Sequence, residues 1–483
     1  MTAMSETKKA ALSGKYAAYP EYKDSGVEWL GEIPEHWQST KIKYGYDVTL
    51  GKMLQKAPKS GTDTYRKYLK AQNIQPNGID ISKVDSMWFS NEELKKLRLQ
   101  CNDVLVSEGG DVGRSAIWKD QLSECYIQNA INRIRPKKGN SPFYFYYWMC
   151  SLKASDYINI ICNKATIAHY TAEKVEVTPL LLPPIKEQTQ IAAFLDYETA
   201  KIDTLIEKQQ KLIELLKEKR KAVISHAVTK GLTPDAPMKD SGIEWLGEVP
   251  EHWDIKKSKH VFEFVTSGSR GWAEYYSDSG NLFFRIANLT RDTIEPKLNS
   301  IQCVCPPRGS EGERSKIKLD DLLISITADL GSVCVANSVI ADGYVSQHVA
   351  LCRPNSLIAS SRWFAFFILS DAAKEQLLGS GYGGTKIQLS LEDIRELVIA
   401  FPPQKEQCEI AQFIDKSLNT FEQLISKAEI QVDLLKERRT ALISAAVTGK
   451  IDVRHFTLKE GIAPTTNSDT NEAVQEAAQE AMA

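Results

Sequence analysis

Two histidines, His36 and His252, are the first side chains to consider for chemistry, because imidazole is the usual acid–base group near neutral pH. They occupy the same place in two nearly identical segments, KDSGVEWLGEIPEHW at 23–37 and KDSGIEWLGEVPEHW at 239–253. The rest of each segment is a turn sequence, Asp-Ser-Gly, followed by large apolar residues and a proline that suits the first position of a short helix. We therefore expect a structural rather than a catalytic role for both histidines.

The motifs of common catalytic and cofactor sites are missing. The sequence contains no G-x-x-x-x-G-K-[ST] phosphate loop, no G-x-G-x-x-G opening a helix, no G-x-S-x-G elbow and no H-E-x-x-H zinc helix. The glycine-rich stretches SEGGDVG at 107–113 and GSGYGG at 379–384 have the wrong spacing for these sites. None of the three Pro-Pro pairs has the preceding Asn or Asp and the following aromatic residue of adenine methylases. Cys303 and Cys305 alone do not make a metal site, so we expect neither catalysis nor a metal.

The composition is that of a globular protein with more than one domain. The chain has 483 residues, of which 42% are hydrophobic and 25% are charged, and this length exceeds one ordinary core. Its nine cysteines form no C-x-x-C pair, which indicates reduced thiols and a cytoplasmic location. No stretch approaches the ~18 apolar residues of a membrane span, and the N-terminus lacks the apolar core of a signal peptide. The net charge of −2 is not typical of a simple nucleic-acid binder.

The chain is an internal repeat. PPIKEQTQIAAFLD at 183–196 returns as PPQKEQCEIAQFID at 402–415, and LLKEKRKAVISHAVTKG at 215–231 returns as LLKERRTALISAAVTGK at 434–450. Weaker matches lie between these in the same order, such as DVLVSEGGDVG with DLLISITADLG. Constant parts that alternate with variable parts predict two modules of one fold that recognise two different things. A plain duplication whose halves drifted neutrally is the alternative.

Two long helices are predicted in the constant parts, over 186–228 and 405–447. Apolar residues recur in each at heptad spacing, which is typical of a helix that pairs with another. The predicted pairing residues are Leu195, Ile202, Leu205, Leu212, Leu216 and Val223 in the first helix, and Ile414, Phe421, Leu424, Leu435 and Leu442 in the second. Gln209 and Gln431 interrupt these rows. If a pseudo-two-fold axis relates the halves, the helices run antiparallel, and each fifteen-residue segment lies at the end of one of them.

The apolar stripe on these helices is wider than a two-stranded seam requires. Ile206, Ile213, Ile224 and Ile425 lie outside the predicted rows. Their presence indicates that the modules or other subunits pack against the helices.

The sequence resembles the specificity subunit of a type I restriction–modification system over about residues 16–455. The motifs KDSG-x-EWLGE-x-PEHW and PP-x-KEQ…I…F-x-D, the latter leading into a helix that ends LLKE(K/R)R-x-A-x-IS-x-AVT, carry the resemblance, and each is present twice. It implies an α+β fold class, with two similar globular α/β target-recognition domains separated by two long antiparallel coiled-coil helices in a pseudo-two-fold internal repeat. The predicted domains are an N-terminal target-recognition domain 1 at 1–182, a conserved helical spacer 1 at 183–231, target-recognition domain 2 at 232–401, a conserved helical spacer 2 at 402–450, and a C-terminal segment at 451–483. The end of that segment, from Ala463, has four acids and no base and is predicted to be disordered.

The resemblance implies a non-catalytic subunit in which each domain reads one half of a bipartite, asymmetric site in double-stranded DNA. The implied partners are two methylation subunits, which use S-adenosylmethionine to modify adenine, and restriction subunits driven by ATP and Mg. No cofactor is expected in this chain itself. Two alternatives stay open: a coiled-coil scaffold protein with two protein-binding modules, and a subunit of a methylation-only or fused nuclease–methylase system.

The residues that contact DNA cannot be carried over from the family, because its contacts lie in the variable parts. Base edges favour Arg, Lys, Asn and Gln, and phosphates favour cations and hydroxyls. On that chemistry the candidates are Lys52, Lys56, Lys59, Lys70, Gln72, Asn73, Arg114 and Lys164 in the first module, and Ser269, Arg270, Arg285, Asn288, Arg291, Arg314 and Lys386 in the second. A solvated surface role is the alternative for each. Lys70 and Arg285, and likewise Asn73 and Asn288, occupy equivalent repeat positions, which favours a shared DNA-facing role.

Overall fold

The computed structural model describes residues 16–162, 169–306, 309–379 and 388–457. The chain forms two compact units: Met1–Glu207 with Val432–Ala483, and Lys208–Gln431. Each unit therefore contains one recognition module and one half of each of the two long helices, α7 (Ile185–Lys230) and α12 (Gln404–Val447).

The first module is built on a mixed set of small sheets. Its main sheet has the strand order β10 (Ser115–Ile117), β9 (Val104–Ser107), β12 (Ile131–Pro136) and β4 (Tyr46–Leu50), and all neighbours are antiparallel. A second sheet is formed by β11 (Tyr126–Ile127), β5 (Thr64–Leu69) and β8 (Asp85–Phe89), and the two-stranded sheets are β1 (Tyr22–Asp24) with β2 (Glu32–Pro34), β3 (Gln38–Lys41) with β13 (Pro179–Leu182), and β6 (Ile74–Gln75) with β7 (Gly78–Ile79). The helices are α2 (Ile42–Gly45), α3 (Asn91–Leu97), α4 (Pro142–Ala154), α5 (Tyr157–Cys162) and α6 (Ala172–Val177), with a 3-10 turn, η1, at Ala71–Asn73. The β9 residues VLVS are buried throughout, as expected of a central strand rich in β-branched residues.

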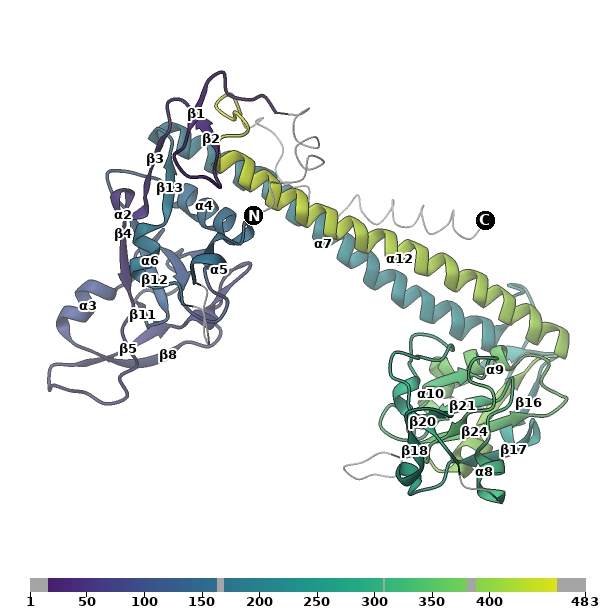
Figure 1. The fold of residues 1–483 in the computed structure, drawn as a ribbon. Helices are drawn as coiled ribbons and strands as arrows, with labels where there is room; N and C mark the ends of the chain where they lie inside the picture. The colour runs from purple at the N-terminus through teal and green to yellow at the C-terminus, as the bar shows by residue number, and fades with distance from the viewer. Residues whose placement is uncertain (1–15, 163–168, 307–308, 380–387, 458–483) are drawn as a thin grey trace. The chain divides into compact units, whose positions relative to one another are not determined.

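The second module repeats this topology. Its main sheet has the order β22 (Val333–Val335), β21 (Leu322–Ser325), β24 (Val349–Pro354) and β17 (Phe262–Ser267), again antiparallel. A second sheet is formed by β18 (Tyr276–Ser277), β20 (Cys303–Val304), β19 (Asn281–Phe284) and β23 (Tyr344–Val345), and the two-stranded sheets are β14 (Met238–Asp240) with β15 (Glu248–Pro250), and β16 (Asp254–Lys257) with β25 (Val398–Phe401). The helices are α8 (Ser310–Ser315), α9 (Ser361–Leu369), α10 (Asp371–Gly379) and α11 (Leu391–Glu396), with 3-10 turns η2 (Ser258–His260), η3 (Trp272–Tyr275) and η4 (Ile286–Asn288). The predicted α+β class with two similar modules in an internal repeat is confirmed (Figure 1).

A buried ion pair recurs at the same place in both main sheets. Arg135 donates to both carboxylate oxygens of Asp103 at 2.6 and 2.8 Å, and Arg353 does the same to Asp321 at 2.9 and 2.8 Å. Each arginine is on the central strand, β12 or β24, and each aspartate side chain is 1% exposed. Burial raises the pKa of Asp321, and the Arg353 guanidinium opposes that rise. The main sheet therefore contains the same arginine–aspartate ion pair in both modules.

The two long helices pair in antiparallel fashion. In the first unit Asp203 of α7 accepts from Nε of Arg439 of α12 at 2.8 Å, and in the second unit Gln209 Nε2 donates to Gln431 Oε1 at 3.2 Å. The residue numbers rise along one helix as they fall along the other, which is the antiparallel arrangement predicted from the repeat. A polar pair at such a position fixes the register of two helices.

Most of the predicted pairing residues are buried or half-buried. Leu195, Ile202, Leu435 and Leu442 belong to one apolar cluster of the first unit, and Ile414 is fully buried in the second. Leu212, Leu216, Val223 and Phe421 are half-buried.

Two of the predicted pairing residues are wrong. Leu205 is 48% exposed and Leu424 is 38% exposed, whereas Ile425 is 9% exposed and Ile206 packs on the core of the first unit. Leu205 and Ile206 follow Ile202 by three and four residues. Viewed down the axis of a helix with heptad repeats, they therefore lie about 50° to either side of it. The spacing alone therefore permits either row, and contacts with the other helix and the module select the isoleucines.

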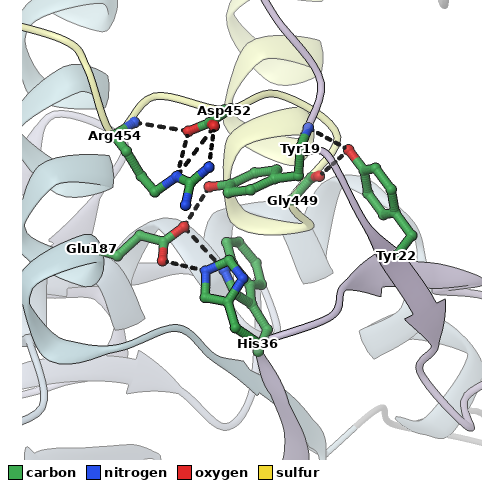
Figure 2. A network of polar contacts seen from close by, with 8 residues as sticks. Tyr19, Tyr22, His36, Glu187, Gly449, Asp452 and Arg454 are labelled. Atoms are coloured by element: carbon green, nitrogen blue, oxygen red, sulfur yellow. Dashed lines mark hydrogen bonds and ion pairs between the residues drawn. The ribbon is translucent and has the colours of Figure 1, made fainter.

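The first fifteen-residue segment binds the start of α7. Glu187 accepts hydrogen bonds from Trp37 Nε1 at 3.0 Å and from the Tyr19 hydroxyl at 2.5 Å, and it contacts His36 Nε2 at 2.8 Å. Figure 2 shows its contacts with Tyr19 and His36. Burial and the bond to Glu187 raise the pKa of Tyr19. His36 is thus part of a structural joint, as expected from the sequence.

The same segment also binds the residues that follow α12. Lys450 Nζ donates to the Glu32 carbonyl of the segment at 2.7 Å, and the hydroxyl of Tyr22, the residue before the segment, donates to the Gly449 carbonyl at 3.0 Å (Figure 2). A Cβ on Gly449 would lie 2.3 Å from Pro34, and its φ of +72° favours glycine. The segment therefore joins the end of one long helix to the start of the other.

The second segment makes the equivalent joint in the second unit. Glu406, in the first turn of α12, accepts from Trp253 Nε1 at 2.9 Å and contacts His252 Nε2 at 2.7 Å. Gly231, just after α7, has φ +77°, and a Cβ there would lie 3.3 Å from the Trp253 ring. The circular arrangement predicted from the repeat is confirmed: each segment fastens the module to a helix end.

Within the described ranges, no helix combines the length and apolarity that crossing a bilayer requires.

Candidate nucleic-acid interface

In the first module several polar loops gather at one end of the main sheet. β9 ends at Ser107 opposite Ile131, where β12 begins, and β4 ends at Leu50 opposite Asn132. The segments 51–63, 107–114 and 128–130 therefore emerge together. Segment 70–73 joins them because Gln128 N donates to Leu69 O at 3.1 Å, and segment 169–171 joins them because Tyr170 N donates to Glu108 O at 2.9 Å. We call these five segments the loop edge of the first module.

The second module has an equivalent loop edge, formed by segments 268–271, 285–288, 326–332, 346–348 and 388–390. Ser346 N donates to Phe284 O at 2.9 Å, and Leu389 N donates to Ile326 O at 2.9 Å. A Cβ on Gly268 would lie 1.9 Å from Val345 O, and one on the equivalent Gly51 would lie 2.4 Å from Gln128. This close backbone approach explains why both modules have glycine where the first loop leaves the sheet.

The candidate residues of the first module that lie in the described ranges all fall on its loop edge. Lys56 and Lys59 are exposed on segment 51–63, and Gln72 is exposed on segment 70–73. Three of the remaining four candidates are already paired with carboxylates: Lys52 with Glu93, Lys70 with Asp85, and Arg114 with Asp111. The fourth, Asn73, is buried. Lys164 lies outside the described residues.

Of the candidates of the second module, Ser269, Arg270, Arg285 and Asn288 fall on its loop edge, whereas Arg291 and Arg314 lie outside it and contact it. Arg270 is exposed, and Ser269 Oγ accepts from Arg314 Nη2 at 3.5 Å. Arg291 contacts Asp329 on segment 326–332 at 2.5 Å, and Arg285 Nη2 donates to Ser300 Oγ at 3.3 Å. Lys386 lies outside the described residues.

The prediction of a DNA-facing role for the two equivalent asparagines does not fit the structure. Asn73 is 3% exposed and Asn288 is fully buried. Asn73 Oδ1 accepts from Lys70 N, while its Nδ2 donates to Asp80 O and Lys83 O, at 2.8 to 2.9 Å. Asn288 makes the same three bonds in its own turn. Their equivalence in the repeat reflects a shared turn, because neither amide has a polar group left for a base edge.

Two polar residues of the first loop edge escaped the sequence reasoning. Glu108 is 6% exposed and Asn132 is fully buried, and Glu108 Oε2 and Asn132 Oδ1 have no hydrogen-bond partner in the described structure. Burial raises the pKa of Glu108, and nearby His169 opposes the rise. The sequence contained one indication of Glu108: when DVLVSEGGDVG is aligned with DLLISITADLG, Glu108 occupies the position of Ile326.

Two modules of one topology, each with a polar and partly cationic loop edge, define a protein with two related recognition surfaces. The chain matches the family described as "Type I restriction modification DNA specificity domain" twice, over residues 34–215 and 250–432. The chain belongs to this family, and its resemblance to type I specificity subunits is confirmed.

Relatives of known name agree. The chain is 24% identical over 449 residues to the "Type I restriction enzyme EcoKI specificity subunit" of Escherichia coli (strain K12), covering 87% of this chain and 90% of that protein. It is 22% identical over 461 residues to the "Type I restriction enzyme MjaIX specificity subunit" of Methanocaldococcus jannaschii, covering 92% and 99%.

Solved structures share the fold. The chain matches one from "Structural basis underlying complex assembly and conformational transition of the type I R-M system" with a TM-score of 0.66, 16% identity and coverage of 86% of this chain and 98% of that chain. It also matches the "HsdS subunit from Thermoanaerobacter tengcongensis" with a TM-score of 0.52, 16% identity and coverage of 87% and 98%. None of these matches supports the alternative of a scaffold with protein-binding modules.

Proposed function

We propose that this chain is the DNA-recognition subunit of a type I restriction–modification complex in the cytoplasm, and that each module reads one half of a bipartite, asymmetric DNA site. The observation that carries the proposal is the pair of loop edges, which have one backbone arrangement and different side chains. Lys52 occupies the place of Ser269, and Glu108 occupies the place of Ile326. Different side chains on one scaffold favour two different half-sites, because base edges are distinguished by the donors and acceptors they meet.

The proposal gives this chain no catalytic step. Adenine methylation belongs to two methylation subunits that bind S-adenosylmethionine, and cleavage belongs to restriction subunits that use ATP and Mg. The exposed leucines on the helix pair support two equivalent docking sites for a partner: Leu205 and Leu424 are equivalent in the repeat, as are Leu215 and Leu434, and all four are exposed. The first unit contains Leu205 and Leu434, and the second contains Leu424 and Leu215.

Exchange of one module tests this function. Residues 40–180 are replaced by the corresponding residues of a relative, and methylated adenines are mapped across the genome of cells that express the complex. We expect one half-site to change and the other to stay. Alteration of both half-sites, or stoichiometric binding of S-adenosylmethionine by the isolated chain, would contradict the proposal.

A further inference from the structure

Glu108 and Asn132 form a pair of buried hydrogen-bond acceptors on one face of the main sheet. The ladder pairs Asn132 with Val106, and it continues past Ser107 because Glu108 N donates to Ala130 O at 2.9 Å. Alternate residues of a strand face the same side, so Glu108 and Asn132 share the face of Val106. Both lie at the loop edge, where β9 ends and β12 begins.

The unpaired atoms of both residues are acceptors. The Asn132 amide is oriented by its own bond, since Nδ2 donates to Tyr170 O at 2.9 Å and leaves Oδ1 unpaired. The Glu108 carboxylate leaves Oε2 unpaired. The Glu108 backbone is held on both sides, by Ala130 and by Tyr170 N at 2.9 Å. A fixed backbone therefore holds two acceptor atoms that have no hydrogen-bond partner among the described residues.

The second module shows that the fold does not need these polar groups. The residues in the equivalent positions are Ile326, 4% exposed, and Ala350, fully buried. An unsatisfied buried polar group destabilises a protein, whereas an apolar residue of similar size does not. The first module therefore retains a destabilising pair where its counterpart has an apolar one, which favours a role in binding.

We propose that Glu108 reads one base pair of the first half-site by accepting a hydrogen bond from an exocyclic amino group, cytosine N4 or adenine N6, in the major groove, and that the buried Asn132 on the same face is a positioning residue. The inference rests on the proposed function and names one specificity contact within it. The two amino groups are the major-groove donors of the bases, whereas guanine and thymine present acceptors there. The Glu108 carboxylate attracts the first kind and repels the second. Rotation about the Glu108 side-chain torsions brings the carboxylate to the base while the held backbone stays in place.

The test measures binding of the complex with its methylation subunits to duplexes in which each base pair of both half-sites is exchanged in turn, at one stated salt concentration. Glu108→Gln adds a donor at the contact, so we expect the preference for the amino-bearing base at one position of the first half-site to fall by roughly 5- to 150-fold. The scan itself shows whether that base is cytosine or adenine. The second half-site serves as an internal reference and stays unchanged.

Two further variants keep the result interpretable. Glu173→Gln, on the exposed face of α6, makes the same charge change and leaves the profile as in the wild type. The double variant Glu108→Ile with Asn132→Ala installs the residues of the second module, and we expect it to fold, to melt no lower than the wild type, and to lose the same preference.

Three outcomes overturn the inference. An unchanged profile in Glu108→Gln shows that the carboxyl has no part in base selection, and a uniform loss over all duplexes shows a general role in folding or backbone binding. A wild-type complex without any sequence preference would instead overturn the proposed function, and the inference with it.

Discussion

Trp37 donates a hydrogen bond from its indole Nε1 to Glu187 at 3.0 Å, and the same bond at 2.9 Å joins Trp253 to Glu406 in the other unit. The two carboxylates differ in their surroundings, because the Glu187 side chain is 6% exposed and that of Glu406 is 32% exposed. Glu187 also accepts from Tyr19, whereas the hydrogen bonds that Glu406 makes with its own segment are those to His252 and Trp253. Because Glu187 and Glu406 are the same residue type in equivalent joints, comparing them separates the effect of burial on stability from that of the residue type.

Glu187→Ala should lower the free energy of unfolding by about 2–4 kcal/mol, because it leaves several buried donors without an acceptor. Glu406→Ala should cost about half as much, since water reaches that carboxylate and can replace it. Thermal unfolding of the two variants measures the difference. Equal losses would contradict the role assigned to burial.

The choice between neighbouring helix positions gives a second prediction. Ile206→Ala should lower the free energy of unfolding by about 1–3 kcal/mol, because Ile206 packs on the core. Leu205→Ala, one residue away and exposed, should change it by less than about 0.5 kcal/mol. Chemical denaturation of both variants measures these losses. A larger loss for Leu205→Ala than for Ile206→Ala would support the pairing row that was predicted from the sequence.

Leu205→Ala should nevertheless weaken assembly with the methylation subunits, and Leu424→Ala should do so to a similar degree because the two are equivalent in the repeat. Size-exclusion chromatography of co-expressed subunits measures the fraction assembled. An exposed residue of the same helix, Lys211, provides the control as Lys211→Ala. Full assembly of both leucine variants would place the docking surface elsewhere.

The buried asparagines give a prediction that separates stability from recognition. Asn73→Ala and Asn288→Ala should each lower the free energy of unfolding by about 1–3 kcal/mol, because each strands three backbone groups of a turn. Neither should change the half-site profile of the complexes that still fold. A changed base preference with an unchanged melting temperature would instead indicate that these asparagines contact DNA.

The stability effect of Glu108 should depend on pH. Its folded-state pKa is raised by burial, so the neutral acid favours the fold and the charged form opposes it. The stabilising contribution is therefore complete below the ordinary glutamate pKa and is lost as the pH rises through the folded-state pKa. Glu108→Gln, which is always neutral, should be more stable than the wild type at pH 7, and the difference should shrink toward pH 4. A difference that is constant with pH would contradict the burial of the charge.

The first and last described residues of the first unit lie close enough to be joined. Tyr16 and Phe456 both contact the Phe194 ring, with centroids 5.4 and 5.1 Å away, and Asp452 N donates to Ala17 O at 2.7 Å. A permuted chain with a linker of about five residues, which spans at most ~18 Å, should connect 457 to 16 and begin within the exposed residues 232–235. We expect it to fold and to methylate the same site as the wild type. Loss of the fold would show that the break at 232–235, and not the joint, carries essential contacts.

The features that could be predicted from the sequence are those that the repeat states twice. The long helices, their antiparallel pairing and the helix-end joints all follow from matching segments, and α7 begins one residue before and ends two residues after its predicted bounds. The second row of the helix seam could not be predicted, because Leu205 and Ile206 are both apolar and only the partner helix distinguishes them. Asn73 and Asn288 were misread for a related reason: a residue shared by both modules can indicate a shared fold as well as a shared ligand. Glu108 was visible only as a difference from Ile326, and its significance depends on burial, which spacing does not report.

The two joints also bear on how such a protein changes over generations. Each module is fastened by a stretch of fifteen residues that is almost the same in both halves, and the hydrogen bonds of that stretch with Glu187, Glu406 and Lys450 hold the ends of the long helices. A genetic crossover inside one of these stretches therefore exchanges a whole module and restores an intact joint in the same event. New target sites can be inherited as complete units, without a series of compensating substitutions at the seam.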